Sequence, residues 1–298
     1  MKESKIFQCS LLTSGLVAQP DKWNSLFSEF LGICIAPAAS PYHEGTKGLY
    51  LRIRGTKRMV LLTCRHVAFT EREANEDFQH RSAADLKKII QPSTGTPAKA
   101  RESVNENIKR SERIMEKNKD LPWASTVRKL NEAMAEKAAG ETLAQRLSDL
   151  EDTSNRTIGH VLFSPKISEG RSPSGEERCR DWTLIKLNQK MHEIVLKELT
   201  NRVFCGMTAK SHTWNATKAE LKGFTPSDHY RLKFDNETHT IELKGTIAKD
   251  IMAAPPTESV SLQDPALVVA MHGRITGLSI GVTNEVVSIK RNSIGPEE

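Results

Sequence analysis

The hydrophobic pattern changes character twice along the chain, and these changes limit the folds that it can adopt. Residues 49–54 alternate apolar and polar side chains, and residues 59–64 form an apolar run after a short turn. This pattern predicts a β-hairpin whose second strand is buried on both faces. The pattern becomes helical from 71 to 152, and β-type segments return at 157–163 and 182–187. The sequence therefore predicts a mainly β protein with an α-helical insertion.

The predicted insertion is rich in charge. Residues 71–152 hold 16 acidic and 15 basic side chains among 82 residues. Pro92, Pro97 and Pro122 are expected to divide this region into separate helices. We interpret the region as a solvated helical excursion from the β fold and not as a binding site.

Composition excludes several classes of function. The chain has 298 residues, a formal net charge of +6 and 5% aromatic residues. It contains no run of about 18 apolar residues, so no membrane-spanning helix is expected. The basic side chains are scattered and the aromatic ones are few, which argues against a nucleic-acid-binding surface.

The cysteines indicate a reducing environment. Their number is odd, and no two of them form a Cys-x-x-Cys pair; they are Cys9, Cys34, Cys64, Cys179 and Cys205. This spacing predicts neither a zinc–thiolate cluster nor a disulfide framework. We expect no metal ion, no cofactor and an intracellular location, cytoplasmic or nuclear, rather than secretion.

His66 is the first candidate for chemistry. It comes two residues after Cys64, where the predicted buried strand ends, and a strand end holds a side chain firmly at the edge of a cleft. One histidine in such a place is also compatible with a purely structural role, satisfied by hydrogen bonds.

Asp181 is the second candidate. It comes directly before the predicted strand 182–187, and an aspartate in this position can simply cap a turn. The two residues are more informative together. An imidazole that accepts a proton from a nucleophile needs a carboxylate on its other ring nitrogen. His66 followed by Asp181, each beside a strand, matches the chain order of chymotrypsin-like proteases.

Two segments resemble the catalytic segments of trypsin-like peptidases. LLTCRHVAF (61–69) is similar to the histidine segment, and RDWTLIKL (180–187) is similar to the aspartate segment. The chain further resembles a family of uncharacterised fungal proteins with a trypsin-like peptidase domain. That likeness is carried by GHVLFSP (159–165), LKGTI (243–247) and HGRITGLSIGVTNEV (272–286).

The resemblance implies a chymotrypsin-like double β-barrel whose second barrel is incomplete. It implies four parts: an N-terminal extension (1–44), a first barrel (45–70 and 153–195), the helical insertion (71–152) and a partial second barrel (196–298). It also implies peptide-bond hydrolysis by a His-Asp-Ser triad, with His66 as the base and Asp181 as its carboxylate. The partner would be a protein or peptide.

The nucleophile of such a triad is not evident. The resemblance places the Gly-rich serine loop beyond Glu298. The serines that follow Asp181 lack a Gly-x-Ser-Gly context; they are Ser211, Ser227, Ser259, Ser261, Ser279, Ser288 and Ser293. Cys205-Gly206 lies only 24 residues after Asp181 (205 − 181), too close for most of a second barrel to intervene.

Three functions remain open from the sequence. The first is a serine peptidase that is inactive as this chain because the nucleophile segment is missing. The second is a pseudoprotease that serves as a protein-binding or scaffold module. The third, which the composition disfavours, is a nucleic-acid-binding protein.

Overall fold

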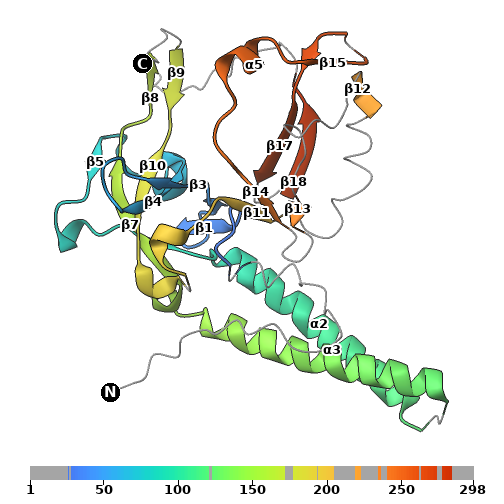
Figure 1. Ribbon diagram of the computed structural model, residues 1–298. Coiled ribbons are helices and arrows are strands. Elements are labelled where there is room, and N and C mark those ends of the chain that lie inside the picture. Colours follow the sequence, from blue (N-terminus) through green and yellow to red (C-terminus); the bar gives the residue numbers. More distant parts are fainter. Residues whose placement is uncertain are drawn as a thin grey trace. The chain divides into compact units, whose positions relative to one another are not determined.

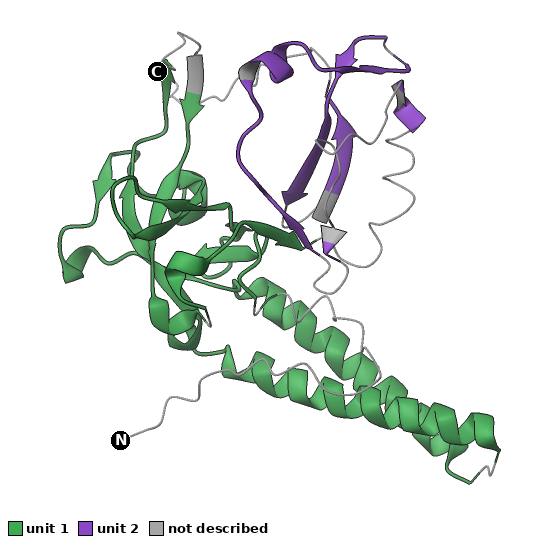
Figure 2. Cartoon of the chain, viewed as in Figure 1, with its two compact units in different colours: residues 1–204 green, residues 205–298 purple. Residues whose placement is uncertain are grey.

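The structure is a computed structural model, and it divides the chain into two compact units, residues 1–204 and residues 205–298 (Figures 1 and 2). It describes residues 26, 28–120, 123–171, 177–192, 194–204, 219–222, 234–235, 240–261, 263–273 and 277–283. We refer to the two parts as unit 1 and unit 2.

Unit 1 is built on an antiparallel sheet of eight strands. Their order is β2-β1-β6-β7-β10-β4-β3, and β5 pairs with β7 beside this path. The strands are β1 (Cys34–Pro37), β2 (Gly45–Thr46), β3 (Leu49–Arg52), β4 (Met59–Thr63), β5 (Phe78–Gln79), β6 (Lys88–Ile90), β7 (Thr157–Ser164) and β10 (Thr183–Leu187). The predicted hairpin and the two predicted later strands of this unit are confirmed as β3–β4, β7 and β10.

The sheet curls into a half-barrel because its outermost strands are neighbours in the sequence. Only Lys47 and Gly48 separate β2 at one end of the order from β3 at the other. The backbone N–H of Lys47 donates to the carbonyl oxygen of Ile33, the residue before β1, at 2.8 Å, so the chain at Lys47 remains paired with that edge of the sheet. Gly48 passes close to β4, since a Cβ atom there would lie 2.3 Å from the Leu62 carbonyl oxygen. A glycine is therefore required where the chain crosses between the two edges.

The core of unit 1 follows from alternation along the central strands. Ile185 of β10 pairs with Leu61 of β4 on one side and with Val161 of β7 on the other. All three are fully buried, and Ile89 of β6 is buried with them. Because side chains alternate between the two faces of a strand, one apolar residue from each strand builds this row.

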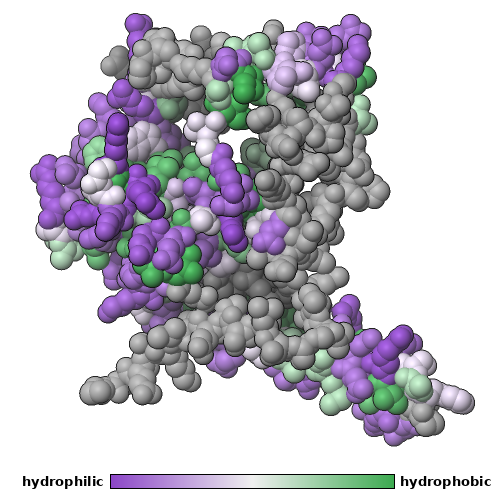
Figure 3. All heavy atoms as spheres, in the orientation of Figure 1, coloured by the Kyte–Doolittle hydropathy of each residue, from purple (hydrophilic) through white to green (hydrophobic). Residues whose placement is uncertain are grey.

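Two long helices project from this sheet. They are α2 (Gly95–Asn118) and α3 (Ala124–Asp149), which run side by side (Figure 1). Val104 and Leu147 belong to a second apolar cluster that also includes Ile33 and Cys34 next to β1, so the base of the helix pair is packed. Ion pairs such as Lys137–Glu112 join the helices farther along. Their far end is largely hydrophilic in Figure 3. The mainly β fold with a helical insertion is thus observed.

The predicted bounds of the parts need correction. The insertion is not helical throughout 71–152, because β5 and β6 lie within it and join the main sheet. Likewise β1 lies within the predicted extension 1–44, and unit 1 continues to Phe204 instead of ending at 195. Strands of two to four residues are too short to stand out in a pattern averaged over a long region.

The prediction that Pro97 separates two helices is wrong, because Pro97 lies within α2. It occupies the first turn of α2, where the backbone N–H groups have no partner within the helix. A proline is tolerated there because no intrahelical hydrogen bond is lost. Pro92, by contrast, precedes the helix, and Pro122 lies outside the described residues.

Unit 1 also contains short elements. They include α1 (Arg65–Ala68), the hairpin of β8 (Ser168–Arg171) and β9 (Glu177–Arg180), β11 (Arg202–Phe204), and 3-10 turns at Ala83–Asp85, Thr153–Arg156, Gln189–Met191 and Leu196–Glu198. Within the described ranges of the chain, no helix is long and apolar enough to cross a membrane.

The described residues of unit 2 include short strands and the short helix α5. They are β12 (Leu221–Lys222), β13 (Phe234–Asp235), β14 (Thr240–Glu242), α5 (Lys249–Ala253), β15 (Thr257–Ser259), β16 (Pro265–Ala266), β17 (Val268–Gly273) and β18 (Gly277–Val282). The longest pairing is the β17–β18 hairpin, in which Val268 lies opposite Val282. The sequence also predicts a strand at 284–290, and these residues lie outside the described part of the chain.

A buried polar network lies under the curled sheet. Lys47 is 1% exposed, and its ammonium donates to the Tyr50 hydroxyl at 3.2 Å and to the Ser28 carbonyl oxygen at 3.4 Å. The Tyr50 hydroxyl donates to the Glu29 carboxylate at 3.2 Å, and His192 Nδ1 lies 2.6 Å from the same oxygen. Burial lowers the pKa of Lys47 to about 7, although the Glu29 charge opposes the shift.

This network predicts a stability that rises with pH. Between about pH 7 and the ordinary lysine value of 10.5, the unfolded chain binds a proton at Lys47 that the folded chain does not. The unfolding free energy then increases by up to about 1.4 kcal/mol per pH unit. Lys47→Met should remove this slope in denaturant titrations across that range, and Lys186→Met, at an exposed position of β10, should keep it. Equal slopes in the wild type and Lys47→Met would contradict the assignment.

Candidate functional site

The pairing of β4 with β10 brings the two candidate residues together. Thr63, the last residue of β4, lies opposite Thr183, the first residue of β10. Because the strands are antiparallel, the chain leaving β4 and the chain entering β10 meet at the same end of the sheet. His66 lies in the single turn of α1 that follows Thr63, and Asp181 lies two residues before Thr183.

His66 and Asp181 form a two-point contact. His66 Nδ1 lies 2.5 Å from Asp181 Oδ2, and the His66 backbone N–H donates to Asp181 Oδ1 at 3.1 Å. Each carboxylate oxygen thus holds a different part of one residue. The predicted approach of the two side chains is confirmed, and their catalytic roles stay a prediction.

The contact determines which ring nitrogen of His66 is free. A carboxylate only accepts hydrogen bonds, so Nδ1 carries the shared proton and Nε2 of the neutral ring keeps its lone pair. The His66 side chain is 63% exposed, whereas that of Asp181 is 24% exposed. No hydrogen bond to Nε2 occurs among the described residues, so Nε2 is available as a proton acceptor.

The backbone around His66 is fixed from two sides. His43 Nε2 lies 2.6 Å from the His66 carbonyl oxygen and must be the donor, because a carbonyl only accepts. Val67 packs directly on Gly45, where a Cβ atom would lie 2.2 Å from a Val67 methyl carbon. The turn that carries His66 is therefore clamped against the segment of β2.

Arg65 anchors the same turn from inside. Its side chain is buried, and Nη1 donates to the Ser164 hydroxyl at 3.0 Å and to the Pro165 carbonyl oxygen at 3.2 Å. The Thr183 hydroxyl donates to Ser164 as well, at 2.7 Å. Arg65 thus ties α1 to the end of β7, which Thr183 of β10 also contacts, and its neighbour His66 is left pointing outward. Sequence reasoning did not identify this anchor, since an arginine beside a histidine gives no sign of burial.

Cys64 is a member of the site that sequence reasoning missed. Its thiol, His66 and Asp181 each offer a ligand-type atom, and these atoms lie within 4.8 Å of one another. Partial burial raises the pKa of the Cys64 thiol, and the negative charges of Asp181 and Cys179 raise it further. Because the thiolate is disfavoured here, Cys64 lacks the lowered pKa of an activated cysteine nucleophile.

The sequence did carry a signal for Cys64. Cys64-Arg65-His66 and Cys179-Arg180-Asp181 repeat the pattern Cys-Arg-x, and both lie at the ends of neighbouring strands. Each cysteine is two residues from a candidate residue, so its side chain emerges from the same region of the chain. Counting Cys-x-x-Cys pairs alone could not detect this arrangement.

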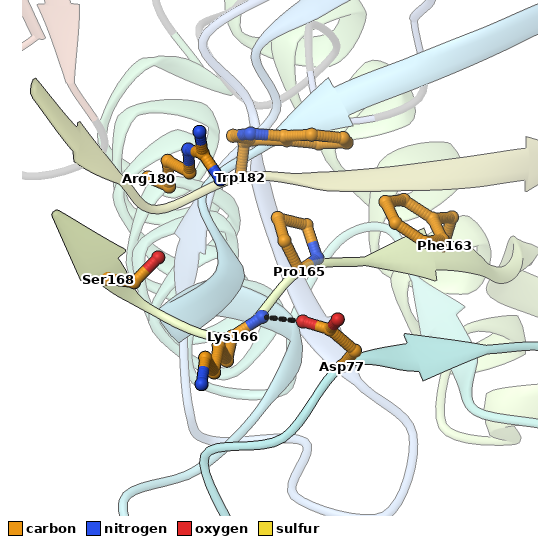
Figure 4. A pocket seen from close by; sticks show the side chains of 7 residues that line it. All are labelled: Asp77, Phe163, Pro165, Lys166, Ser168, Arg180 and Trp182. Atoms are coloured by element: carbon orange, nitrogen blue, oxygen red, sulfur yellow. Dashed lines mark hydrogen bonds between the residues drawn. The ribbon is translucent and has the colours of Figure 1, made fainter. Parts of the chain in front are cut away.

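A pocket of about 350 Å³ is lined in part by Arg180 and Trp182, on either side of Asp181 in the chain (Figure 4). Trp182 and Phe163 form its aromatic wall, with their ring centroids 5.6 Å apart. The remaining lining residues are Asp77, Pro165, Lys166, Ser168 and Arg180. Arg180 and Trp182 are the chain neighbours of Asp181, so the segment between β9 and β10 that carries Asp181 also shapes this pocket.

Three further histidines among the described residues make structural contacts. His192 is buried and lies against Glu29, as described above. The His80 and His160 rings lie 4.7 Å apart, and burial together with the His80 and Lys186 charges lowers the pKa of His160.

Three of the serines considered as nucleophiles lie among the described residues, away from His66 in the sequence, and have structural places of their own. Ser259 and Ser261 both donate to Glu220 in unit 2, and Ser279 lies within β18 opposite Met271. The remaining candidate nucleophiles lie outside the described residues; they are Cys205, Ser211, Ser227, Ser288 and Ser293.

No protein-family model, curated protein or solved structure matched the chain. The resemblance to trypsin-like peptidases therefore stays a prediction that rests on the residues quoted above.

The charge of Asp181 should suppress the reactivity of Cys64. Asp181→Asn removes one of the negative charges that raise the Cys64 pKa, so more thiolate is present at pH 8. We expect alkylation of Cys64 by iodoacetamide to accelerate roughly 2- to 10-fold, since the thiolate is the reactive form. Peptide mapping by mass spectrometry measures the rate at Cys64 alone.

The matched control is Asp85→Asn, which removes an exposed carboxylate that does not affect the Cys64 pKa. This variant should leave the rate unchanged. An unchanged or slower reaction at Cys64 in Asp181→Asn would refute the electrostatic coupling.

Proposed function

We propose that His66 and Asp181 are the general base and orienting carboxylate of a trypsin-like hydrolytic site. One observation carries the proposal: Asp181 contacts both Nδ1 and the backbone N–H of His66, at 2.5 Å and 3.1 Å. A carboxylate that merely neutralised an imidazole would need only the first contact. The second fixes the orientation of the ring relative to its own backbone.

The chemistry follows from this orientation. With Nδ1–H held by Asp181, the lone pair on Nε2 accepts the proton that a nucleophile loses when it attacks a carbonyl carbon. The Asp181 charge then stabilises the imidazolium that forms. The same imidazolium returns its proton to the leaving group when the bond to the carbonyl carbon breaks.

The finer fold assignment belongs to the same proposal. The curled antiparallel sheet of unit 1, with His66 leaving one strand and Asp181 entering its neighbour, supports a barrel of the chymotrypsin type. Unit 2, residues 205–298, would correspond to part of a second barrel.

The nucleophile distinguishes an active peptidase from a binding module. No hydroxyl group of the described residues bonds to His66 Nε2, and the raised pKa of Cys64 argues against a cysteine nucleophile. We infer that this chain does not cleave peptides by itself. It would share the site architecture of serine peptidases without completing a triad.

A protein-binding or scaffold role is the second candidate. The observation that favours it is the pocket beside Asp181, which combines the Trp182 and Phe163 rings with the cations of Lys166 and Arg180. The same lining includes the Asp77 carboxylate, which would repel an acidic group, so it suits an aromatic side chain of a bound protein segment.

An activated ester tests the base without requiring a protein nucleophile. Water attacks the carbonyl carbon of p-nitrophenyl acetate, His66 accepts a proton from that water, and p-nitrophenolate departs. We expect slow hydrolysis that falls to the buffer rate in His66→Ala. In Asp181→Asn it should fall by about 10-fold or more, because the ring loses its orienting partner. Release of p-nitrophenolate is measured by absorbance.

Two controls define the outcome. His272→Gln, on β17 of unit 2, should hydrolyse the ester like the wild type, and a fluorophosphonate probe should label no serine. Ester hydrolysis that persists in His66→Ala would contradict the proposed role of His66 as the general base. A fluorophosphonate adduct that depends on His66 would instead show that the chain is an active serine hydrolase.

A further inference from the structure

The site contains three different kinds of metal-binding side chain. Cys64, His66 and Asp181 supply a thiol, an imidazole and a carboxylate, and one atom of each lies within 4.8 Å of the others. Proposed catalysis uses only the imidazole and the carboxylate. The thiol is exposed and has no role in that mechanism.

The donor set has a definite preference among metal ions. Zn²⁺ binds sulfur, nitrogen and oxygen donors of these types, and a catalytic or exchangeable zinc site commonly has three protein ligands and one open position. The thiolate disfavours Mg²⁺ and Ca²⁺, which take oxygen ligands. One thiolate and one carboxylate also balance the two positive charges of the ion.

We propose that Cys64, His66 and Asp181 form a three-ligand site for Zn²⁺ or a similar divalent transition metal. His66 Nδ1 and Asp181 Oδ2 now lie 2.5 Å apart. Two ligands on one tetrahedral ion, with metal–ligand bonds of about 2.1 Å, lie roughly 3.4 Å apart. A small rotation of the exposed His66 ring opens that space.

Binding would exchange one proton for the metal ion. The Cys64 thiol releases its proton to the solvent, and the proton on His66 Nδ1 moves to Nε2, so that the ring binds the ion as a neutral imidazole beside Asp181. Water occupies the fourth position. No oxidant or reductant is involved, because Zn²⁺ does not change its oxidation state.

The surroundings hold the three ligands in place. All three lie beside the β4–β10 pairing, which fixes the ends of both segments. Arg65, between Cys64 and His66, is buried and bonded to Ser164, and His43 holds the His66 carbonyl oxygen. Only side-chain rotations are then needed to gather the ligands, which lowers the entropic cost of binding.

Metal binding would regulate the proposed hydrolytic site. The ion takes both the nitrogen and the carboxylate that orient the His66 ring, so base catalysis stops while the metal is bound. This consequence rests on the proposed function, whereas the metal site itself does not. Ester hydrolysis should therefore decline with the same midpoint as metal binding.

Co²⁺ tests the site in the full chain, because a thiolate bound to Co²⁺ gives a charge-transfer band in the near ultraviolet. We expect one equivalent to bind with this band. Cys64→Ser should abolish the band, and His66→Ala and Asp181→Asn should each weaken binding by about 10-fold or more. The matched control is Cys179→Ser, because Cys179 is an exposed thiol that does not belong to the ligand set. It should bind within about 2-fold of the wild type.

The outcomes separate the two proposals. A charge-transfer band that persists in Cys64→Ser, or that Cys179→Ser also abolishes, overturns the metal site. Circular dichroism confirms that each variant is folded before its spectrum is interpreted. A normal Co²⁺ spectrum, together with no ester hydrolysis by the metal-free protein, would refute the hydrolytic function and leave the metal site standing. Ester hydrolysis without the band would do the reverse.

Discussion

The antiparallel pairing of β4 with β10 is the constraint on which the site depends. Thr63 opposite Thr183 sets the register, and this register places His66 beside Asp181 although 115 positions separate them in the chain. A shift by one residue would turn the side chains of β10 to the other face. The apolar row of Leu61, Ile185 and Val161 prevents such a shift, because it would expose Ile185. Packing in the core thus determines the geometry at the surface.

Buried charge supports the exposed chemistry. Arg65 lies inside the turn and satisfies its guanidinium on β7, so that the next side chain is presented outward. Lys47 occupies the crossing between the two edges of the curled sheet, although burial lowers its pKa. Charging a buried amine with incomplete compensation reduces stability, so this crossing carries a cost in free energy while Lys47 is protonated. The site and the closure of the sheet therefore both depend on polar groups under the surface.

Part of this arrangement could be predicted from the sequence. The β3–β4 hairpin follows from local alternation, and the approach of His66 to Asp181 follows from their places beside two strands. The strands β1 and β6 could not be delimited, because three or four residues within longer apolar or charged runs give no periodic signal. Burial of Lys47 and Arg65 and the nearness of Cys64 could not be predicted, since each depends on partners far away in the sequence.

The tautomer of His66 tests the central claim most directly. A long-range ¹H–¹⁵N NMR spectrum of the imidazole nitrogens, assigned by comparison with His66→Ala, identifies which nitrogen carries the proton in the neutral ring. The account predicts a proton on Nδ1 and a bare Nε2 in the wild type, because Asp181 accepts from Nδ1. A neutral ring protonated on Nε2 would contradict the account, since Nε2 could then not accept a proton from a nucleophile.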